Sequence, residues 1–232
     1  MLKSINIIST ISAICILVGI SQPLRPQNPE GKSEKDKLVA VIGEEAPEFS
    51  LKDQFGKNHR LSNYKGKIVV LEWFNETCPF CKKAWQKGVI PSLLENLKEG
   101  ETEVVYLAVN STANRPEEDV IKGASEFLEE LEIEVPMLMD YDGAIGKMYG
   151  AKTTPHMFVV NADGVLSYQG ALTDDPRFKN VGKETNYVLG AVNQLKAGKE
   201  VSPDHVKQWG CSVKYAGDKP RGLPKKGNPR RF

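Results

Sequence analysis

The sequence predicts an α/β fold in which helices cover both faces of a central β-sheet, and three observations carry this prediction. Residues 68–74 and 103–110 are short, strongly apolar runs, and each is followed by a stretch whose apolar residues have helical spacing. Two further strand-like runs then flank a short turn, and one more helical stretch follows. Strands that alternate with helices in this way are typical of a sheet covered by helices.

The first half of this fold is predicted to lead directly to a cysteine pair. From Val39 onward, short apolar groups alternate with Gly, Pro and Asn, which indicates a β-hairpin. Residues 68–74, with the sequence IVVLEWF, then predict a buried strand. Residues 79–97 follow helical spacing, and Pro91 predicts a kink or break within them. We therefore expect Cys78 at the N-terminus of a helix.

The second half repeats strands and helices in the same manner. Residues 103–110, EVVYLAVN, predict a second buried strand, and residues 116–131 predict an amphipathic helix whose first turn is acidic, as a helix dipole favours. Residues 156–161 and 165–170 predict two strands around a turn. Residues 185–197 predict a final helix, ended by a glycine.

Residues 1–21 predict either a signal peptide or a membrane anchor. Lys3 precedes an apolar run from Ile5 to Ile20, which is the pattern of a secretory signal. The run is slightly short for a span of about 20 residues, so cleavage and retention both stay open. Cys15 is expected to be part of this run, because Ile14 precedes it where a lipidation site needs a small residue. Both alternatives predict an extracytoplasmic location.

Two other segments are predicted to lack stable structure. Residues 22–38 form a linker, since positions 22–37 hold three prolines, seven charges and one large apolar residue. The end of the chain, from Asp218, is rich in Lys, Arg, Pro and Gly, and predicts a basic tail.

Composition limits the classes of partner and of disulfide chemistry. The 232 residues have a net charge of +1, so no overall field indicates a nucleic-acid partner. Four cysteines, unevenly placed, are too few for a disulfide-stapled scaffold and are expected to do chemistry instead. One folded, monomeric domain with attached segments is expected, with no cofactor.

The sequence Cys78-Pro79-Phe80-Cys81 is the strongest candidate site. Two thiols three residues apart, after a strand and at the start of a helix, can close a small disulfide ring. The free N–H groups and positive dipole end of the helix would stabilise a thiolate on Cys78, expected nearer solvent, while Cys81 would lie one turn in and resolve. Two buried core cysteines or half of a zinc site are the alternatives, although no second cysteine pair exists to complete such a site.

The surrounding residues resemble a known family. IVVLEWFNETCPFCKK is similar to the active-site strand, turn and helix of thioredoxin-like proteins, and Thr153-Thr154-Pro155 is similar to their cis-proline loop. Residues 43–198 fit the wider redoxin pattern, which includes alkyl hydroperoxide reductase/thiol-specific antioxidant (AhpC/TSA) relatives and an extracytoplasmic redoxin-like branch. The resemblance implies a thioredoxin fold with a central mixed β-sheet over residues 39–200, followed by an extension, residues 201–232, that ends in the basic tail.

One motif departs from the general pattern. Residues 210–215, GCSVKY, resemble a C-terminal motif of one peroxiredoxin-like branch, in which the position of Cys81 is often aliphatic. The dithiol here favours disulfide exchange, while the branch resemblance leaves the natural reaction open. Cys211 is either a third redox thiol or a simple exposed or packed thiol.

The resemblance also implies roles around the dithiol. Pro155 is expected to be cis and to face the Cys78 sulfur, with a trans proline at a strand start as the alternative. Thr154 is expected to keep its backbone groups free to pair with an extended substrate. Glu72 matches the buried acid of thioredoxins and could relay the proton that Cys81 loses, or it could face solvent at a strand edge. His156 could tune the thiolate or bind metal, but a structural role is favoured.

Three functions follow from these residues. The first is a thiol–disulfide oxidoreductase that exchanges a Cys78–Cys81 disulfide with extracytoplasmic protein thiols and disulfides, its redox partner not being specified by the sequence. The second is a peroxiredoxin-like peroxidase, but that chemistry wants Thr or Ser three residues before the reactive cysteine and Pro seven before, where Asn75 and Leu71 stand. The third is a Cu(I)-binding module using Cys78, Cys81 and His156; carriers of this kind typically separate their cysteines by three residues, which disfavours it.

Overall fold

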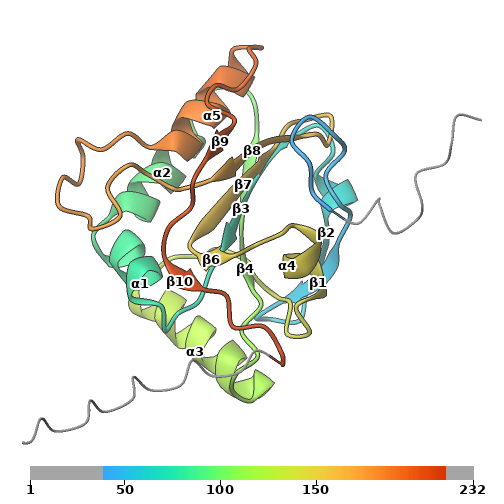
Figure 1. Ribbon diagram of the computed structural model, residues 1–232, viewed down its shortest axis with the longest axis vertical. Coiled ribbons are helices and arrows are strands. Elements are labelled where there is room, and N and C mark those ends of the chain that lie inside the picture. Colours follow the sequence, from blue (N-terminus) through green and yellow to red (C-terminus); the bar gives the residue numbers. More distant parts are fainter. Residues whose placement is uncertain (1–38, 218–232) are drawn as a thin grey trace, which may run out of the picture.

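The computed structural model describes residues 39–217 (Figure 1). The predictions for residues 1–38, including Cys15, and for the tail from Asp218 lie outside the described residues. Among the residues described, no helix combines the length and apolar character needed to cross a bilayer.

An eight-stranded mixed sheet forms the centre of the fold, in the order β2-β1-β5-β4-β3-β7-β8-β9. Strands β3, β4 and β5 run parallel to one another, while β7 pairs antiparallel with both β3 and β8. Two further short strands, β6 and β10, form a separate antiparallel pair. The strand bounds are β1 Ser50–Asp53, β2 Asn58–Arg60, β3 Ile68–Trp73, β4 Val104–Asn110, β5 Met137–Met139, β6 Thr153–Thr154, β7 His156–Val160, β8 Leu166–Gly170, β9 His205–Val206 and β10 Cys211–Ser212.

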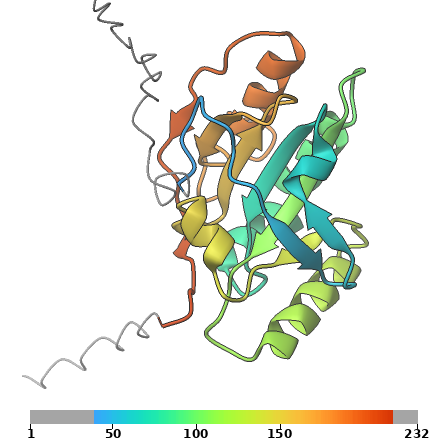
Figure 2. The same cartoon turned by 90° about the vertical axis from the view of Figure 1, so that its right-hand side faces the viewer.

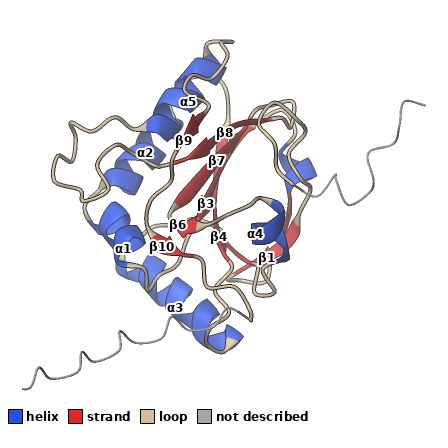
Figure 3. Cartoon of the chain, in the orientation of Figure 1, coloured by secondary structure: helices blue, strands red, loops and turns tan. Residues whose placement is uncertain are grey.

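Helices cover both faces of this sheet, but unequally (Figures 1 and 3). One face carries the four longer helices, α1 Pro79–Gln86, α2 Val89–Leu97, α3 Glu117–Glu130 and α5 Tyr187–Lys196. The opposite face carries the short helix α4, Ala144–Met148, the 3-10 helix η2, Leu61–Tyr64, and the segment before β1. The predicted α/β class, with a central mixed sheet and helices, is confirmed.

Strand β3 divides two apolar cores because its side chains alternate between the faces of the sheet. Ile68 and Val70 pack in the core beneath the longer helices, whereas Leu71 and Trp73 pack in the core on the opposite face. All six residues of β3 are buried. The strand that leads to the cysteine pair is therefore a fully buried strand in the interior of the sheet, between β4 and β7.

The predicted helix over residues 79–97 is two helices, and the break does not fall at Pro91. Gly88 separates α1 from α2 and has a φ of 85°, a left-handed conformation that glycine adopts without a steric cost. Pro91 lies in the first turn of α2, where a backbone N–H has no partner within the helix. The proline therefore fits an intact helix, and the prediction of a break at Pro91 is wrong.

The segment after α5 packs on the fold. Strand β9 pairs with β8 and adds the eighth strand, and β10 pairs with β6. In Figure 1 this segment, drawn in red, runs from β9 past β6 and the start of α1, and Figure 2 shows it passing the short helix α4. The part of this segment around Trp209 and Cys211 lies beside the cysteine pair, since Trp209 contacts Phe80 and Cys211 pairs with Thr154.

Candidate active site

The end of β3 and a tight turn place Cys78 at the start of α1. The Asn75 side chain accepts hydrogen bonds from the Thr77 N–H at 2.8 Å and the Thr77 hydroxyl at 2.7 Å, and the Asn75 carbonyl accepts one from the Cys78 N–H at 2.9 Å. Cys78 is the N-cap residue of α1, in extended conformation, and Pro79 occupies the first helical position. A proline is favoured there because its missing N–H would have no helical partner. The strand–turn–helix arrangement predicted for the site is confirmed.

A partly buried ion pair lies next to this turn. The Glu76 carboxylate pairs with Arg115 and accepts a hydrogen bond of 3.0 Å from the Asn110 side chain. Glu76 is almost fully buried, so its charge depends on these partners. Asn110 is the last residue of β4, and Arg115 lies in the loop that follows. Neither could be identified from the sequence, because no local motif connects them to the cysteines.

The two thiols differ sharply in their environment. Cys81 is fully buried, and burial raises its pKa well above the usual value. Its thiol donates to the Cys78 sulfur, which is the largest cause of a lowered pKa at Cys78; burial opposes this, and the Cys81 backbone N–H adds to it. The two shifts therefore favour the thiolate on Cys78 rather than on Cys81. Cys78 is 3% exposed against 0% for Cys81, so Cys78 is the residue nearer solvent, as expected, although both thiols are buried.

The cis-proline loop lies directly against the Cys78 sulfur. The Thr154–Pro155 peptide bond is cis, which confirms that expectation. In its thiol form Cys78 donates a hydrogen bond to the Thr154 carbonyl, with a sulfur–oxygen distance of 3.0 Å. The buried Thr154 hydroxyl has no oxygen or nitrogen partner among the described residues, and it is one of the groups that lower the pKa of Cys78. Thr154 thus offers an acceptor to the thiol and a donor to the thiolate.

The backbone edge of Thr154 is not free, contrary to the sequence-based expectation. Strand β10 pairs antiparallel with β6, with Cys211 opposite Thr154 and Ser212 opposite Thr153. The resemblance to thioredoxin-like proteins could not predict this, because the occupying strand comes from the segment that follows the resembling region. Burial, and next the neighbouring Cys78, raise the pKa of Cys211.

Glu72 is the buried acid rather than a solvent-facing one. Its side chain is fully buried and accepts hydrogen bonds from the Tyr106 hydroxyl at 2.6 Å and the Trp85 indole N–H at 3.0 Å. Burial raises the pKa of Glu72 to about 8, although both hydrogen bonds lower it. The charge of Glu72 in turn raises the pKa of Cys81, which places the carboxyl in electrostatic reach of the resolving thiol.

His156 lies on the other face of the sheet and is not brought to the thiols. Its ring contacts Phe158, with centroids 4.5 Å apart, and Phe158 belongs to the core opposite the one that holds the cysteines. Its Nδ1 atom accepts a hydrogen bond from the Lys152 N–H at 3.4 Å, and burial lowers its pKa to about 3. The predicted copper set of Cys78, Cys81 and His156 is therefore not assembled. Across residues 39–217, no group of three His, Cys, Asp or Glu side chains has the arrangement of a metal site.

Comparison with known proteins agrees with this geometry. A sequence model of the AhpC/TSA family matches residues 42–169, more than half of the chain. The chain belongs to the AhpC/TSA family. Thiol-disulfide oxidoreductase ResA from Bacillus cereus is 30% identical over 132 residues, which cover 57% of this chain and 69% of that protein.

Solved structures show the same fold over a longer part of the chain. An uncharacterized conserved protein from Geobacillus kaustophilus is 26% identical with a TM-score of 0.66, and the match covers 78% of this chain and 95% of that one. A hypothetical protein from Sinorhizobium meliloti 1021 has a TM-score of 0.65 at 22% identity, covering 78% and 97% of the two chains. The relatives named as thiol-disulfide oxidoreductases support thiol–disulfide exchange as the chemistry of an AhpC/TSA chain with this dithiol.

The peroxide-binding pattern weighed in the sequence is not present in this AhpC/TSA member. Asn75 stands three residues before Cys78, and its side-chain oxygen is engaged by Thr77. Leu71 stands seven residues before Cys78 and is fully buried within β3. Neither residue supplies a hydroxyl or a proline turn to orient a peroxide at the Cys78 sulfur.

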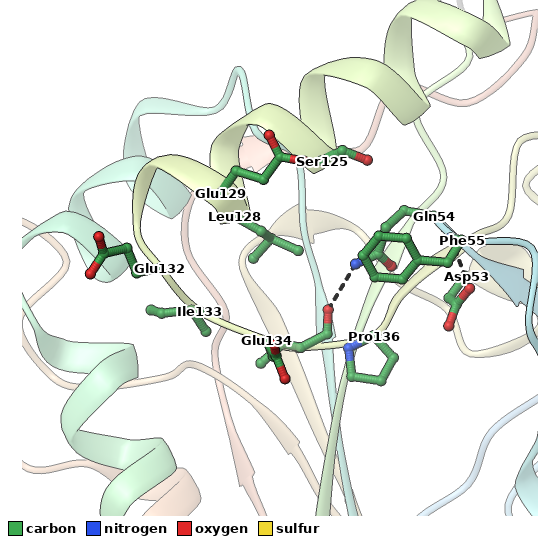
Figure 4. A pocket seen from close by; sticks show the side chains of 11 residues that line it. Asp53, Gln54, Phe55, Ser125, Leu128, Glu129, Glu132, Ile133, Glu134 and Pro136 are labelled. Atoms are coloured by element: carbon green, nitrogen blue, oxygen red, sulfur yellow. Dashed lines mark hydrogen bonds between the residues drawn. The ribbon is translucent and has the colours of Figure 1, made fainter.

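A pocket of about 640 Å³ lies elsewhere on the molecule (Figure 4). It lies between the loop at the end of β1 and the segment around the end of α3, and Phe55 and Pro136 line it together with several glutamates. The Gln54 side chain crosses it to donate to the Val135 carbonyl at 3.2 Å. None of its lining residues belongs to the dithiol site, so we assign it no part in the thiol chemistry.

Sequence reasoning missed the residues that hold Glu72 and cover Phe80. Tyr106 and Trp85 reach Glu72 from β4 and α1. The only hint in the sequence was that each carries a polar group, a hydroxyl or an indole N–H, within an otherwise apolar stretch, since such groups usually need a hydrogen-bond partner when buried. Trp209 lies over Phe80, with ring centroids 6.1 Å apart, and donates to the Thr173 carbonyl at 2.9 Å. No pattern in the sequence connects Trp209 to the cysteine pair.

Proposed function

We propose that this protein is a thiol–disulfide oxidoreductase that acts on protein thiols and disulfides outside the cytoplasm through Cys78 and Cys81. One observation carries the proposal: a thiolate-favouring cysteine at the start of α1 receives a hydrogen bond from a fully buried second thiol. Such a pair separates the attacking thiol from the resolving thiol.

In the reducing direction, the Cys78 thiolate attacks one sulfur of a substrate disulfide. A bond forms between Cys78 and that sulfur, the substrate disulfide breaks, and the other substrate sulfur leaves as a thiolate that takes up a proton. Cys81 then loses its proton and attacks the Cys78 sulfur. The Cys78–Cys81 disulfide forms, the mixed disulfide breaks and the substrate is released with both sulfurs reduced. The oxidising direction is the same sequence reversed.

Glu72 is proposed to accept the proton that Cys81 loses. The Cys78 thiolate is one of the charges that raise the pKa of Glu72, and the mixed disulfide removes this charge. The carboxylate is thereby favoured at the step that needs a base. Hydrogen bonds from Tyr106 and Trp85 stabilise the same ionised form.

Thr154 and Pro155 are proposed to shape the access of a substrate sulfur to Cys78. The Thr154 carbonyl lies 3.0 Å from the sulfur, and its hydroxyl favours the thiolate. Proline offers no N–H that would compete for the thiolate. These are positioning roles, since neither residue exchanges electrons.

Trapping of a mixed disulfide tests this function. Cys81→Ser/Cys211→Ser removes the two free thiols that neighbour Cys78, so a protein-disulfide substrate is expected to stay covalently attached to Cys78. Cys78→Ser is expected to trap nothing and to abolish disulfide turnover. If the double variant traps no substrate while the wild type reduces peroxide with a rate that Cys78→Ser abolishes, the function is instead that of a peroxidase.

A further inference from the structure

The segment that contains Cys211 is fastened to the site from both sides. On one side, Trp209 packs against Phe80 and against Phe178, with ring centroids 6.1 and 5.5 Å apart. On the other side, the Tyr215 hydroxyl donates to the Ala151 carbonyl at 2.8 Å, and its ring lies close against Gly143. Cys211 therefore lies on a held segment and not on a free tail.

Between these anchors, β10 occupies the backbone edge beside the cis-proline. Cys211 is opposite Thr154, and the Val213 N–H donates to the Lys152 carbonyl at 3.1 Å. Gly210 makes the close approach feasible, because a Cβ atom there would stand 2.3 Å from the Thr154 carbonyl oxygen. An extended peptide that added a strand at this edge would take the same place.

The register brings a third sulfur to Cys78. Cys211 is partly buried and packs on the core that contains the dithiol, and it pairs with Thr154, whose carbonyl oxygen lies 3.0 Å from the Cys78 sulfur. Cys81 hydrogen-bonds with the same Cys78 sulfur. All three cysteines are free thiols in this structure, so Cys78 has a sulfur neighbour both in its own helix and in β10.

We propose that β10 is a built-in substitute for a substrate strand, and that Cys211 is a third redox centre that closes a disulfide with Cys78. This inference rests on the proposed function, because it requires Cys78 to be the attacking thiol. The role resembles that of a substrate cysteine, except that it is covalently part of the enzyme.

The exchange needs no outside oxidant once the enzyme is oxidised. The Cys211 thiolate attacks the Cys78 sulfur of the Cys78–Cys81 disulfide. The bond between Cys78 and Cys211 forms, the bond between Cys78 and Cys81 breaks, and Cys81 leaves as a thiolate that takes the proton Cys211 gave up. Two thiol electrons have moved within the protein, and the number of disulfides is unchanged. By the same attack, Cys211 releases a substrate from a mixed disulfide on Cys78.

The test uses the full-length protein carrying Cys81→Ser, reduced and then exposed to glutathione disulfide. Cys78 is expected to form a glutathione mixed disulfide that Cys211 resolves, so that non-reducing peptide mapping by mass spectrometry finds Cys78 joined to Cys211. In Cys81→Ser/Cys211→Ser the glutathione adduct is expected to persist on Cys78 at a level at least about tenfold higher. Peptide mapping separates these species from any adduct on Cys15.

A register-shifted control tests the placement. Cys81→Ser/Cys211→Ser/Ser212→Cys has the same number of thiols as Cys81→Ser. It moves one thiol from position 211 to the next position of β10, where side chains point to the opposite face. The adduct on Cys78 is expected to persist in this variant. Crosslinking of Cys78 to position 212 with the same yield would overturn the proposal, because proximity in sequence and not the pairing with Thr154 would then account for the bond.

Two other outcomes are distinguishable. If the adduct on Cys78 persists in Cys81→Ser as it does in the double variant, Cys211 is not a redox centre, while the proposed function stands. If Cys78 acquires no adduct in any variant, both proposals fail. Should Cys81→Ser not fold, the wild-type chain decides: after equilibration with glutathione disulfide, a Cys78–Cys211 peptide supports the inference and its absence overturns it.

Discussion

The Tyr106 hydroxyl donates a hydrogen bond of 2.6 Å to the Oε2 atom of Glu72, in the centre of the core beneath the longer helices. The Trp85 indole donates to the same oxygen at 3.0 Å, so two side chains from different elements point at one carboxyl group. Buried carboxyl groups usually acquire such partners, since an isolated charge there would be costly. The arrangement keeps a proton-accepting group dry and within electrostatic reach of Cys81.

Glu72→Gln is expected to change the pH dependence of stability. The pKa of Glu72 is raised to about 8 in the folded protein, so between its ordinary range and pH 8 the folded state binds a proton that the unfolded state has lost. The stability that this bound proton contributes is fully present at low pH. It is lost as pH rises from the ordinary carboxyl range to about 8, by about 1.4 kcal/mol per pH unit for a whole proton. The free energy of unfolding of the variant, relative to wild type, should therefore increase from pH 5 to pH 8 in urea titrations. A difference that stays constant over this range would contradict a buried, protonated Glu72.

Tyr106→Phe is expected to raise the pKa of Glu72 further, because it removes a donor to the carboxylate. The loss of one buried hydrogen bond should lower the free energy of unfolding by about 1 kcal/mol. In rapid-mixing assays, resolution of a mixed disulfide by Cys81 should need a higher pH than in wild type. Tyr64→Phe, a change in the same chemical group on the opposite face of the sheet, serves as the control and should leave that pH profile in place.

Cys81→Ala and Cys81→Ser should separate two contributions to the Cys78 thiolate. The Cys81 thiol is the largest cause of the lowered pKa of Cys78, so the alanine variant should raise that pKa, while serine keeps a hydroxyl donor and should raise it less. Alkylation of Cys78 at mildly acidic pH should slow by roughly tenfold for each unit of the rise. Equal profiles for the two variants would show that the Cys81 side chain does not donate to Cys78.

Trp209→Ala should open the site. Trp209 packs against Phe80 and Phe178, and Cys78, two residues before Phe80, is only 3% exposed. Removing the indole should cost about 2 kcal/mol of stability, less than for a fully buried tryptophan, and should accelerate reaction of Cys78 with protein disulfides more than with small disulfides. Phe55→Ala is the matched control, since Phe55 is 81% exposed and lines the remote pocket. If both variants accelerate the reaction equally, the segment around Trp209 does not restrict access.

The proposed location can be tested without knowledge of the substrate. A reporter that works only outside the cytoplasm should be active when it is fused after Asp36. Lys3 and the apolar run to Ile20 form the pattern of a secretory signal, which would export it. Replacing Ile16 and Leu17 by lysines should abolish this activity. Activity of a reporter that works only in the cytoplasm would contradict the proposed location.

The sequence predicted what depends on local pattern. The buried strand 68–74, the helix start at Cys78 and the strands around the turn after Pro155 follow from runs, caps and turns of a few residues. The break assigned to Pro91 failed because a proline in the first turn costs a helix nothing, and the glycine that does separate the helices gave a weaker signal.

What the sequence could not supply depends on register and on long-range pairing. Tyr106 reaches Glu72 only because β3 and β4 run parallel with Val70 opposite Tyr106. His156 is two residues before Phe158, so the two share a face of β7, but which face holds the dithiol depends on how the sheet packs. The pairing of Cys211 with Thr154 joins residues 57 positions apart, and no turn or spacing marks it.

Gly210 gives the molecule a recognisable signature. Its φ of 130° is rarely adopted by other residues, and the adjacent carbonyl leaves no room for any side chain. Gly210 and Cys211 are therefore expected to occur together. A homologue that kept the cysteine but carried a larger residue before it would be unable to pair β10 with β6, and the backbone edge beside the cis-proline would stay open. The dipeptide and the upstream dithiol together offer a way to sort redoxin sequences into two groups. In one group the chain's own strand occupies the backbone edge beside the cis-proline, and in the other that edge is open to partners.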